Sequence, residues 1–176
     1  MAHDLWYALQ VRPRRESMVA EILRNKGYEP FLPTYKAKRR WSDRTKILAA
    51  PLFSGYLFCR FDLETRLPIL RTPGVNSIVG AGRNPQAINE AEIEAIRSVI
   101  NSGVGCNPYP RLPVGQLVCV EYGSLEGLTG VVQKNKNEYR LIISVTLLMR
   151  SVSVEIDRAW LTPIRSEKRF VPPLAL

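Results

Sequence analysis

The sequence predicts an α+β protein in which a small α/β sandwich with a mainly antiparallel sheet precedes a small β-barrel. Strand-like and helix-like segments alternate through residues 1–103, whereas residues 114–164 contain short strand-like runs. Residues 104–113 form the predicted linker, because the stretch NSGVGCNPYPRLP has three prolines, two glycines and no apolar periodicity. We expect residues 165–176 to form a frayed tail.

The composition indicates a globular protein with a polyanionic partner. The 176 residues include 25 lysines and arginines against 16 acidic residues, which gives a net charge of +9. A basic balance of this size suits nucleic acid, although it says nothing about specificity. No apolar run approaches the roughly 18 residues of a membrane span, and the first residues lack the features of a secretory signal. We therefore expect a cytoplasmic protein with no membrane partner.

The residues that catalysis and metal binding require are scarce. The three cysteines form no CxxC pair and have no histidine nearby, so neither a disulfide framework nor a zinc site is indicated. His3 is the single histidine, and no paired acids or phosphate-binding loop occurs. We expect a protein that is not an enzyme and needs no cofactor.

The first domain is expected to begin with a strand and a helix. Leu5–Val11 is rich in strand formers, and Pro13 suits a first helical turn. Gly27 is a typical residue just beyond a helix end. One stripe of the predicted helix is formed by Met18, Val19, Ile22 and Leu23.

Three arginines lie where this strand passes into this helix. They are Arg12, Arg14 and Arg15. They could contact phosphates or simply be solvated, and the sequence leaves both readings open.

A basic segment follows the short predicted strand Tyr28–Leu32. Its cations are Lys36, Lys38, Arg39, Arg40, Arg44 and Lys46. Trp41 lies among them, and Asp43 is the only opposing charge. This pattern predicts an exposed hairpin or a mobile loop. Cations around an aromatic residue are typical of a nucleic-acid groove, and a solvated loop is the alternative.

The chain is organised around the stretch PLFSGYLFCRFD, Pro51–Asp62. Its turn residues precede a strand in which Tyr56 and Phe58 share one face. Phe53 lies close to both in sequence. Three aromatic residues so near one another predict either core packing or a partner-binding surface.

The rest of the first domain alternates short elements. Thr65 is a candidate cap for a short helix with Pro68 in its first turn. Ser77–Val79 and Gln86–Ile88 are candidate strands.

A final helix is predicted before the linker. Asn89 followed by Glu92 resembles a capping box, and Gly103 is a natural stop. Apolar residues at helical spacing are Ile93, Ile96 and Ile100.

The second domain changes to an all-β pattern. Its five strand-like runs are Leu117–Val120, Gly130–Gln133, Arg140–Val145, Val152–Ile156 and Trp160–Leu161. Within it, the stretch VGQLVCVEYGSLEGLTGVV resembles the KOW motif. The N-terminal segments that contain Trp6, Pro33, PLFSGYLF and GVNSIVG resemble the N-terminal (NGN) domain of NusG-type transcription factors. The NGN domain, linker and KOW order therefore resembles the layout of that family.

This resemblance implies an SH3-like KOW barrel and a set of binding residues on the NGN domain. Phe53, Tyr56 and Phe58 would bind the clamp helices of RNA polymerase. Thr65, Arg66 and Leu67 would touch the opposite side of the cleft, although the threonine-rich motif of some specialised members is absent. The resemblance places Arg12, Arg14 and Arg15 where specialised members meet the displaced DNA strand. The basic pattern described above, and not the resemblance, assigns contacts with DNA or nascent RNA to Lys36, Lys38, Arg39, Arg40 and Trp41.

The resemblance also implies a partner surface on the barrel. It is the stretch Leu147, Leu148 and Met149, where Leu148 replaces an aromatic residue and Met149 a glycine. Termination factor Rho or a ribosomal protein is the family's partner there, and core packing is the alternative reading. These departures, together with the basic hairpin and the absence of an acidic balance, favour a specialised paralogue that serves particular operons. We expect a monomer. The alternatives are a housekeeping NusG and an RNA-binding, ribosome-associated KOW protein.

Overall fold

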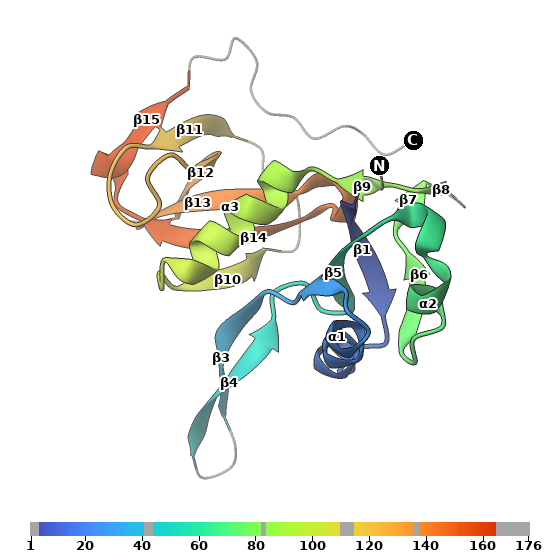
Figure 1. Cartoon of the computed structure of the whole chain (residues 1–176). Helices are drawn as coiled ribbons and strands as arrows, with labels where there is room; N and C mark the ends of the chain where they lie inside the picture. Colours follow the sequence, from blue (N-terminus) through green and yellow to red (C-terminus); the bar gives the residue numbers. More distant parts are fainter. Residues whose placement is uncertain (1–3, 41–43, 82–83, 110–114, 136–137, 165–176) are drawn as a thin grey trace. The chain divides into compact units, whose positions relative to one another are not determined.

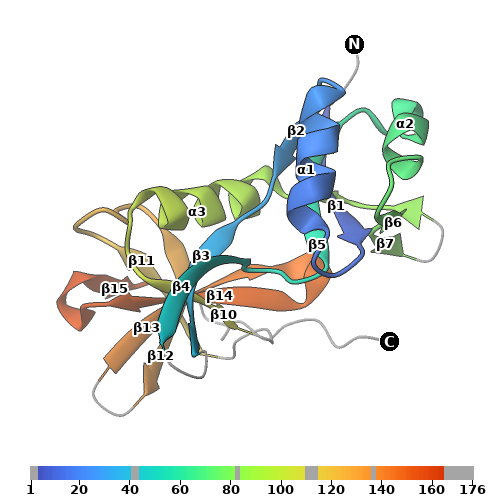
Figure 2. The same cartoon turned by 90° about the horizontal axis from the view of Figure 1, so that it is seen from below.

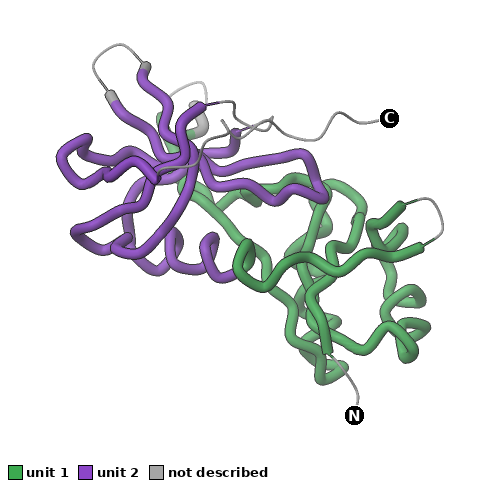
Figure 3. Tube along the Cα trace, turned by 90° about the horizontal axis from the view of Figure 1, so that it is seen from above, with its two compact units in different colours: residues 1–93 green, residues 94–176 purple. Residues whose placement is uncertain are grey.

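The computed structural model describes residues 4–40, 44–81, 84–109, 115–135 and 138–164. The chain divides into two compact units, Met1–Ile93 and Glu94–Leu176 (Figure 3). We call them unit 1 and unit 2 and describe each by itself. No helix among the described residues is long and apolar enough to cross a membrane.

Unit 1 is built on an antiparallel sheet with the strand order β2-β5-β1-β6, in which β9 also pairs with β1 (Figure 1). The strands are β1 (Leu5–Val11), β2 (Glu29–Phe31), β5 (Tyr56–Phe61), β6 (Val75–Ile78) and β9 (Ala87–Ile88). The predicted first strand and the central strand of the aromatic stretch are confirmed. They pair with each other from Leu5 opposite Phe61 to Gln10 opposite Tyr56.

Helix α1 (Glu16–Asn25) provides the core of unit 1 together with one face of this sheet. Val19 and Leu23 pack in one buried cluster with Leu9 and Leu57. Met18 is only partly buried. The buried apolar face of α1 is instead formed by Val19, Ala20 and Leu23. The predicted end of the helix is confirmed: Gly27 adopts φ = 86°, a conformation that costs glycine little.

The basic segment forms a separate two-stranded antiparallel hairpin, β3 (Thr34–Arg40) and β4 (Thr45–Pro51). It extends away from the sheet of unit 1 in both views (Figures 1 and 2). Of the two structures predicted for this segment, the hairpin is the one found. Trp41 and Asp43 lie outside the described residues.

The short elements after β5 differ from the prediction in one detail. A 3-10 turn, Leu63–Thr65, precedes helix α2 (Leu67–Leu70), and the N-cap of α2 is Arg66 without a side-chain cap. The predicted cap at Thr65 is therefore wrong, because its hydroxyl donates to the carbonyl of Asp62 inside that 3-10 turn. Pro68 does occupy the first turn of α2.

Two small strands and a longer helix complete the first part of the chain. β7 (Gly80–Ala81) pairs with β8 (Asn84–Pro85). Helix α3 (Glu90–Asn101) follows β9 and spans the boundary between the units. The side chain of Asn89 accepts a hydrogen bond from the Ala91 amide at 2.9 Å, as a cap at this position should.

Unit 2 is a curled antiparallel sheet with the order β10-β14-β13-β12-β11-β15 (Figure 1). Its strands are β10 (Cys106–Tyr109), β11 (Gln116–Val120), β12 (Thr129–Asn135), β13 (Glu138–Val145), β14 (Arg150–Ile156) and β15 (Leu161–Pro163). Five of these strands correspond to the five predicted runs. β10 falls inside the predicted linker, and it is a strand because it pairs with β14 from Cys106 opposite Val154 to Tyr109 opposite Ser151.

Unit 2 has a buried core, and the close approach of two of its strands requires glycine at one position. Val118, Leu141 and Val154 are buried from three different strands. A Cβ on Gly130 would lie 2.7 Å from the Ile142 carbonyl oxygen, so only glycine allows β12 and β13 to approach so closely.

Candidate functional site

The aromatic stretch is held by hydrogen bonds at its turn. Gly55 adopts φ = 82°, and its amide donates to Glu16 Oε1 at 2.9 Å. Its carbonyl accepts from the Val11 amide, also at 2.9 Å. Because Glu16 is buried, this carboxylate ties the start of α1 to the turn that leads into β5. The position at which β5 begins is thus fixed by both β1 and α1.

Four rings pack against one another around this strand. Phe58 lies 5.4 Å from Phe53 and 6.1 Å from Phe31 between ring centroids, and Phe31 lies 6.4 Å from Trp6. Phe58 does not belong to the core cluster formed with α1, whereas its neighbours Leu57 and Cys59 do. The alternation predicted along β5 is therefore present.

The three predicted partner-binding aromatics differ in exposure. Phe53 is 1% exposed and Phe58 is 0% exposed, whereas Tyr56 is only partly buried. Of the three rings, Tyr56 is the one that a partner can reach in this structure. The two phenylalanines are buried and pack against each other, with 5.4 Å between their ring centroids.

The segment Thr65–Leu67 is exposed on the surface of unit 1. Arg66 donates from Nη1 to the Leu63 carbonyl at 3.0 Å, which steadies its guanidinium. Leu67 and Leu70 are large apolar side chains left exposed on α2. This short helix therefore presents an apolar edge beside a cation.

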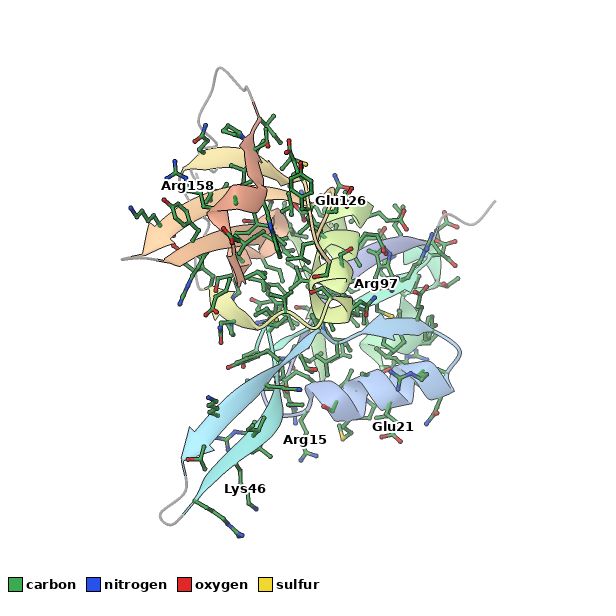
Figure 4. All side chains as sticks on the ribbon, turned by 90° about the vertical axis from the view of Figure 1, so that its left-hand side faces the viewer. Arg15, Glu21, Lys46, Arg97, Glu126 and Arg158 are labelled. Atoms are coloured by element: carbon green, nitrogen blue, oxygen red, sulfur yellow. The ribbon has the colours of Figure 1, made fainter. Side chains whose placement is uncertain are left out.

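The three arginines before α1 form an exposed turn. Arg14 has φ = 68°, an uncommon conformation for a residue with a side chain, and the Arg15 amide donates to the Arg12 carbonyl at 3.0 Å. The exposed Arg15 side chain donates from Nη1 to Met18 Sδ at 3.6 Å, in the first turn of α1 (Figure 4). The turn thus presents positive charge to solvent.

The hairpin strands carry further cations, two of which are exposed in the described part of the chain. Lys36 and Lys38 are exposed on β3, and neither forms an ion pair within the described part of the chain. Arg39 and Arg40 belong to the same strand, but their side chains lie outside what the structure describes. Lys46 lies in the outer part of β4 (Figure 4).

The predicted partner surface of the barrel is split between interior and surface. Leu148 ends a 3-10 turn and is 8% exposed, whereas Met149 is 43% exposed. Met149 also has φ = 52° and ψ = 33°, the left-handed conformation that glycine adopts most easily. Leu148 therefore packs into the barrel, and Met149 forms its exposed tip.

Two of the described thiols, Cys59 and Cys106, are poorly suited to nucleophilic chemistry. Burial, with a contribution from the nearby Glu29 carboxylate, raises the pKa of Cys59 to about 12. Burial also raises the pKa of Cys106. In the described ranges, no group of three His, Cys, Asp or Glu residues could hold a metal ion.

The sequence analysis did not select three residues that shape the aromatic stretch and the hairpin. Glu16 reads as an ordinary charge in a first helical turn, yet it is buried against Gly55. Phe31 lies in a three-residue strand and joins the aromatic cluster. Ile47, 61% exposed on the hairpin, could have been found only from the pairing of β3 with β4.

Comparison with known proteins gives consistent matches. The family model described as transcription termination factor nusG matches residues 4–97. The "Transcription termination/antitermination protein NusG" of Helicobacter pylori is 27% identical over 164 residues, which cover 86% of this chain and 93% of that protein. The Thermus thermophilus protein of the same name is 30% identical over 149 residues, 77% of this chain and 80% of its own. A solved structure of Thermotoga maritima NusG shares the fold, with a TM-score of 0.56 and 20% identity over 92% of this chain and 98% of that one.

Proposed function

This chain belongs to the NusG family, and from that membership we propose that it binds elongating RNA polymerase and promotes processive, pause-resistant transcription. The relatives are named as termination/antitermination proteins, and the chain is accordingly a NusG-type transcription factor. The observation that supports the polymerase contact is β5, on which Tyr56 is only partly buried and Phe58, two residues further on, packs against Phe53.

We propose that Tyr56 makes the first contact with the clamp helices and that Phe53 and Phe58 hold it in place. An aromatic side chain on a fixed strand loses little conformational freedom when it binds, which favours its use as an anchor. Thr65, Arg66 and Leu67 are proposed to touch the polymerase at a second place, where α2 exposes an apolar edge.

The test is the association of full-length protein with purified core RNA polymerase. Tyr56→Ala should weaken this association about tenfold or more, because hot-spot aromatics typically contribute 2 kcal/mol or more. Tyr122→Ala is the matched control, since Tyr122 is an exposed tyrosine of unit 2. Equal association of the native protein and Tyr56→Ala would remove the basis of the proposed contact.

The proposed nucleic-acid contacts belong to the N-terminal part of the chain. Residues 1–113 carry 17 basic and 10 acidic residues, whereas residues 114–164 carry five of each. Arg12, Arg14 and Arg15 are proposed to meet the displaced DNA strand, and the hairpin is proposed to add further contacts. The neutral charge of the barrel supports a protein partner instead.

We also propose that the protein is a specialised member serving particular operons. Met149 supports this, because its exposed side chain gives the barrel tip a shape that glycine cannot give. A ribosomal protein or Rho remains the proposed class of partner for this tip, and we propose that Met149 weakens the contact with Rho. The test compares Rho-dependent termination with the native protein and with Met149→Gly. Met149→Gly should increase termination, and identical termination would argue against that role of Met149.

A further inference from the structure

The hairpin has two faces of different character, which follow from its pairing. Lys36 stands opposite Ala49, Lys38 opposite Ile47, and Arg40 opposite Thr45. Directly paired residues project to the same side of a ribbon, and alternate residues project to opposite sides. The face that we call the lysine face is therefore formed, among residues whose side chains are described, by Lys36, Lys38, Thr45, Ile47 and Ala49.

Exposure distinguishes the lysine face from the opposite one. Lys36, Lys38, Thr45, Ile47 and Ala49 are all exposed. On the opposite face, Tyr35, Ala37, Lys46 and Ala50 are partly buried, and Leu48 is exposed. The lysine face is thus the open side of the ribbon.

The two lysines of the lysine face lie in a row. Lys36 and Lys38 are two residues apart along β3, which is about 6.8 Å in an antiparallel strand. Within the described residues, neither lysine is neutralised by a carboxylate. A row of unpaired cations with an exposed apolar side chain beside it is complementary to a polyanion that also offers apolar groups.

We propose that the β3–β4 ribbon binds double-stranded DNA by placing its lysine face in the major groove. That groove is about 12 Å wide and admits a two-stranded ribbon. Lys36 and Lys38 would meet phosphates, and Ile47 would contact base edges such as thymine methyl groups. The proposal deepens the nucleic-acid part of the proposed function and rests on it.

RNA is a poorer match to this face. The major groove of an RNA duplex is too deep and narrow for side chains to read. Single strands are usually held by exposed aromatic rings on which bases stack. The described residues of the lysine face include no aromatic ring, and Tyr35 is partly buried on the opposite face; Trp41 lies outside the described residues.

The first experiment measures binding of the full-length protein to a labelled DNA duplex between 50 and 200 mM salt, without polymerase. Lys36→Gln with Lys38→Gln should lower the slope of log affinity against log salt by about 1.8, since each phosphate contact contributes about 0.9. The double variant Arg24→Gln with Arg71→Gln is the control, because it removes the same charge from exposed positions of unit 1 outside the hairpin. Equal slopes for the two double variants would overturn the assignment.

The second experiment compares the two faces at neighbouring residues. Ile47→Ser should weaken DNA binding roughly fivefold without changing the salt slope, because it removes apolar contact and no charge. Leu48→Ser, on the opposite face, should leave binding unchanged. Equal losses for both variants would contradict the lysine face as the binding side.

The third experiment replaces the ligand. Duplex RNA and single-stranded DNA of the same sequence should bind at least about tenfold more weakly than duplex DNA. Equal binding of either one, or no binding of duplex DNA at 50 mM salt, would overturn the proposal. Because no polymerase is present, these results are independent of the Tyr56 test.

Discussion

The hairpin and the aromatic strand adjoin in the chain, yet they use their side chains in opposite ways. β3 and β4 expose the charges of the lysine face to solvent, whereas β5 buries Phe58 completely and leaves Tyr56 only partly covered. A substitution on the hairpin can therefore change binding alone. A substitution on β5 changes binding and stability together unless it is made at Tyr56.

The largest expected effect is at Phe58. Phe58→Ala should lower the free energy of unfolding by about 3–5 kcal/mol, because it opens a cavity between Phe31 and Phe53. Tyr56→Ala, on the same face of β5, should cost less than about 1.5 kcal/mol. Urea denaturation of the full-length variants measures both. Similar losses at the two positions would mean that Tyr56 is as much a core residue as Phe58.

A second comparison extends this division to the barrel. Leu148→Ala should cost about 2–3 kcal/mol, since Leu148 is nearly buried. Met149→Gly should stabilise the protein by up to about 1 kcal/mol, because glycine relieves the left-handed conformation at some cost in chain entropy. Thermal unfolding of both variants gives the two values. Destabilisation by Met149→Gly would show that the methionine side chain packs usefully at the tip.

The smallest expected effect is on the hairpin. Lys36→Gln with Lys38→Gln should change the free energy of unfolding by less than about 0.5 kcal/mol, because both side chains are exposed and form no ion pair with described residues. Urea denaturation tests this value beside the DNA measurement. A larger loss would mean that the lysines stabilise the ribbon and that their effect on DNA binding is indirect.

The sequence predicted the regular elements more reliably than the contacts between them. Leu5–Val11 and the strands of unit 2 followed from local patterns that do not depend on distant residues. β10 was missed because Cys106–Tyr109 has no strand pattern of its own and is ordered by pairing with β14. The cap at Thr65 failed for a similar reason, since its hydroxyl is used within the preceding turn.

The binding surfaces were predictable as segments but not residue by residue. Alternation placed Tyr56 and Phe58 on one face, yet only the packed structure distinguishes the accessible ring from the buried one. The same is true of Leu148 and Met149. Glu16 could not be selected at all, because its role depends on a hydrogen bond to Gly55, 39 positions away.

The pairing of β3 with β4 has a consequence for comparing homologous proteins. Removing one residue of β3 between Lys38 and the turn would shift the pairing by one position and carry Lys36 and Lys38 to the other side of the ribbon. Two relatives with identical numbers of lysines in this segment could then differ in what they bind. The total charge of the segment is therefore a poor basis for comparing such relatives. The comparison should ask whether each lysine lies at an odd or an even position counted from the turn.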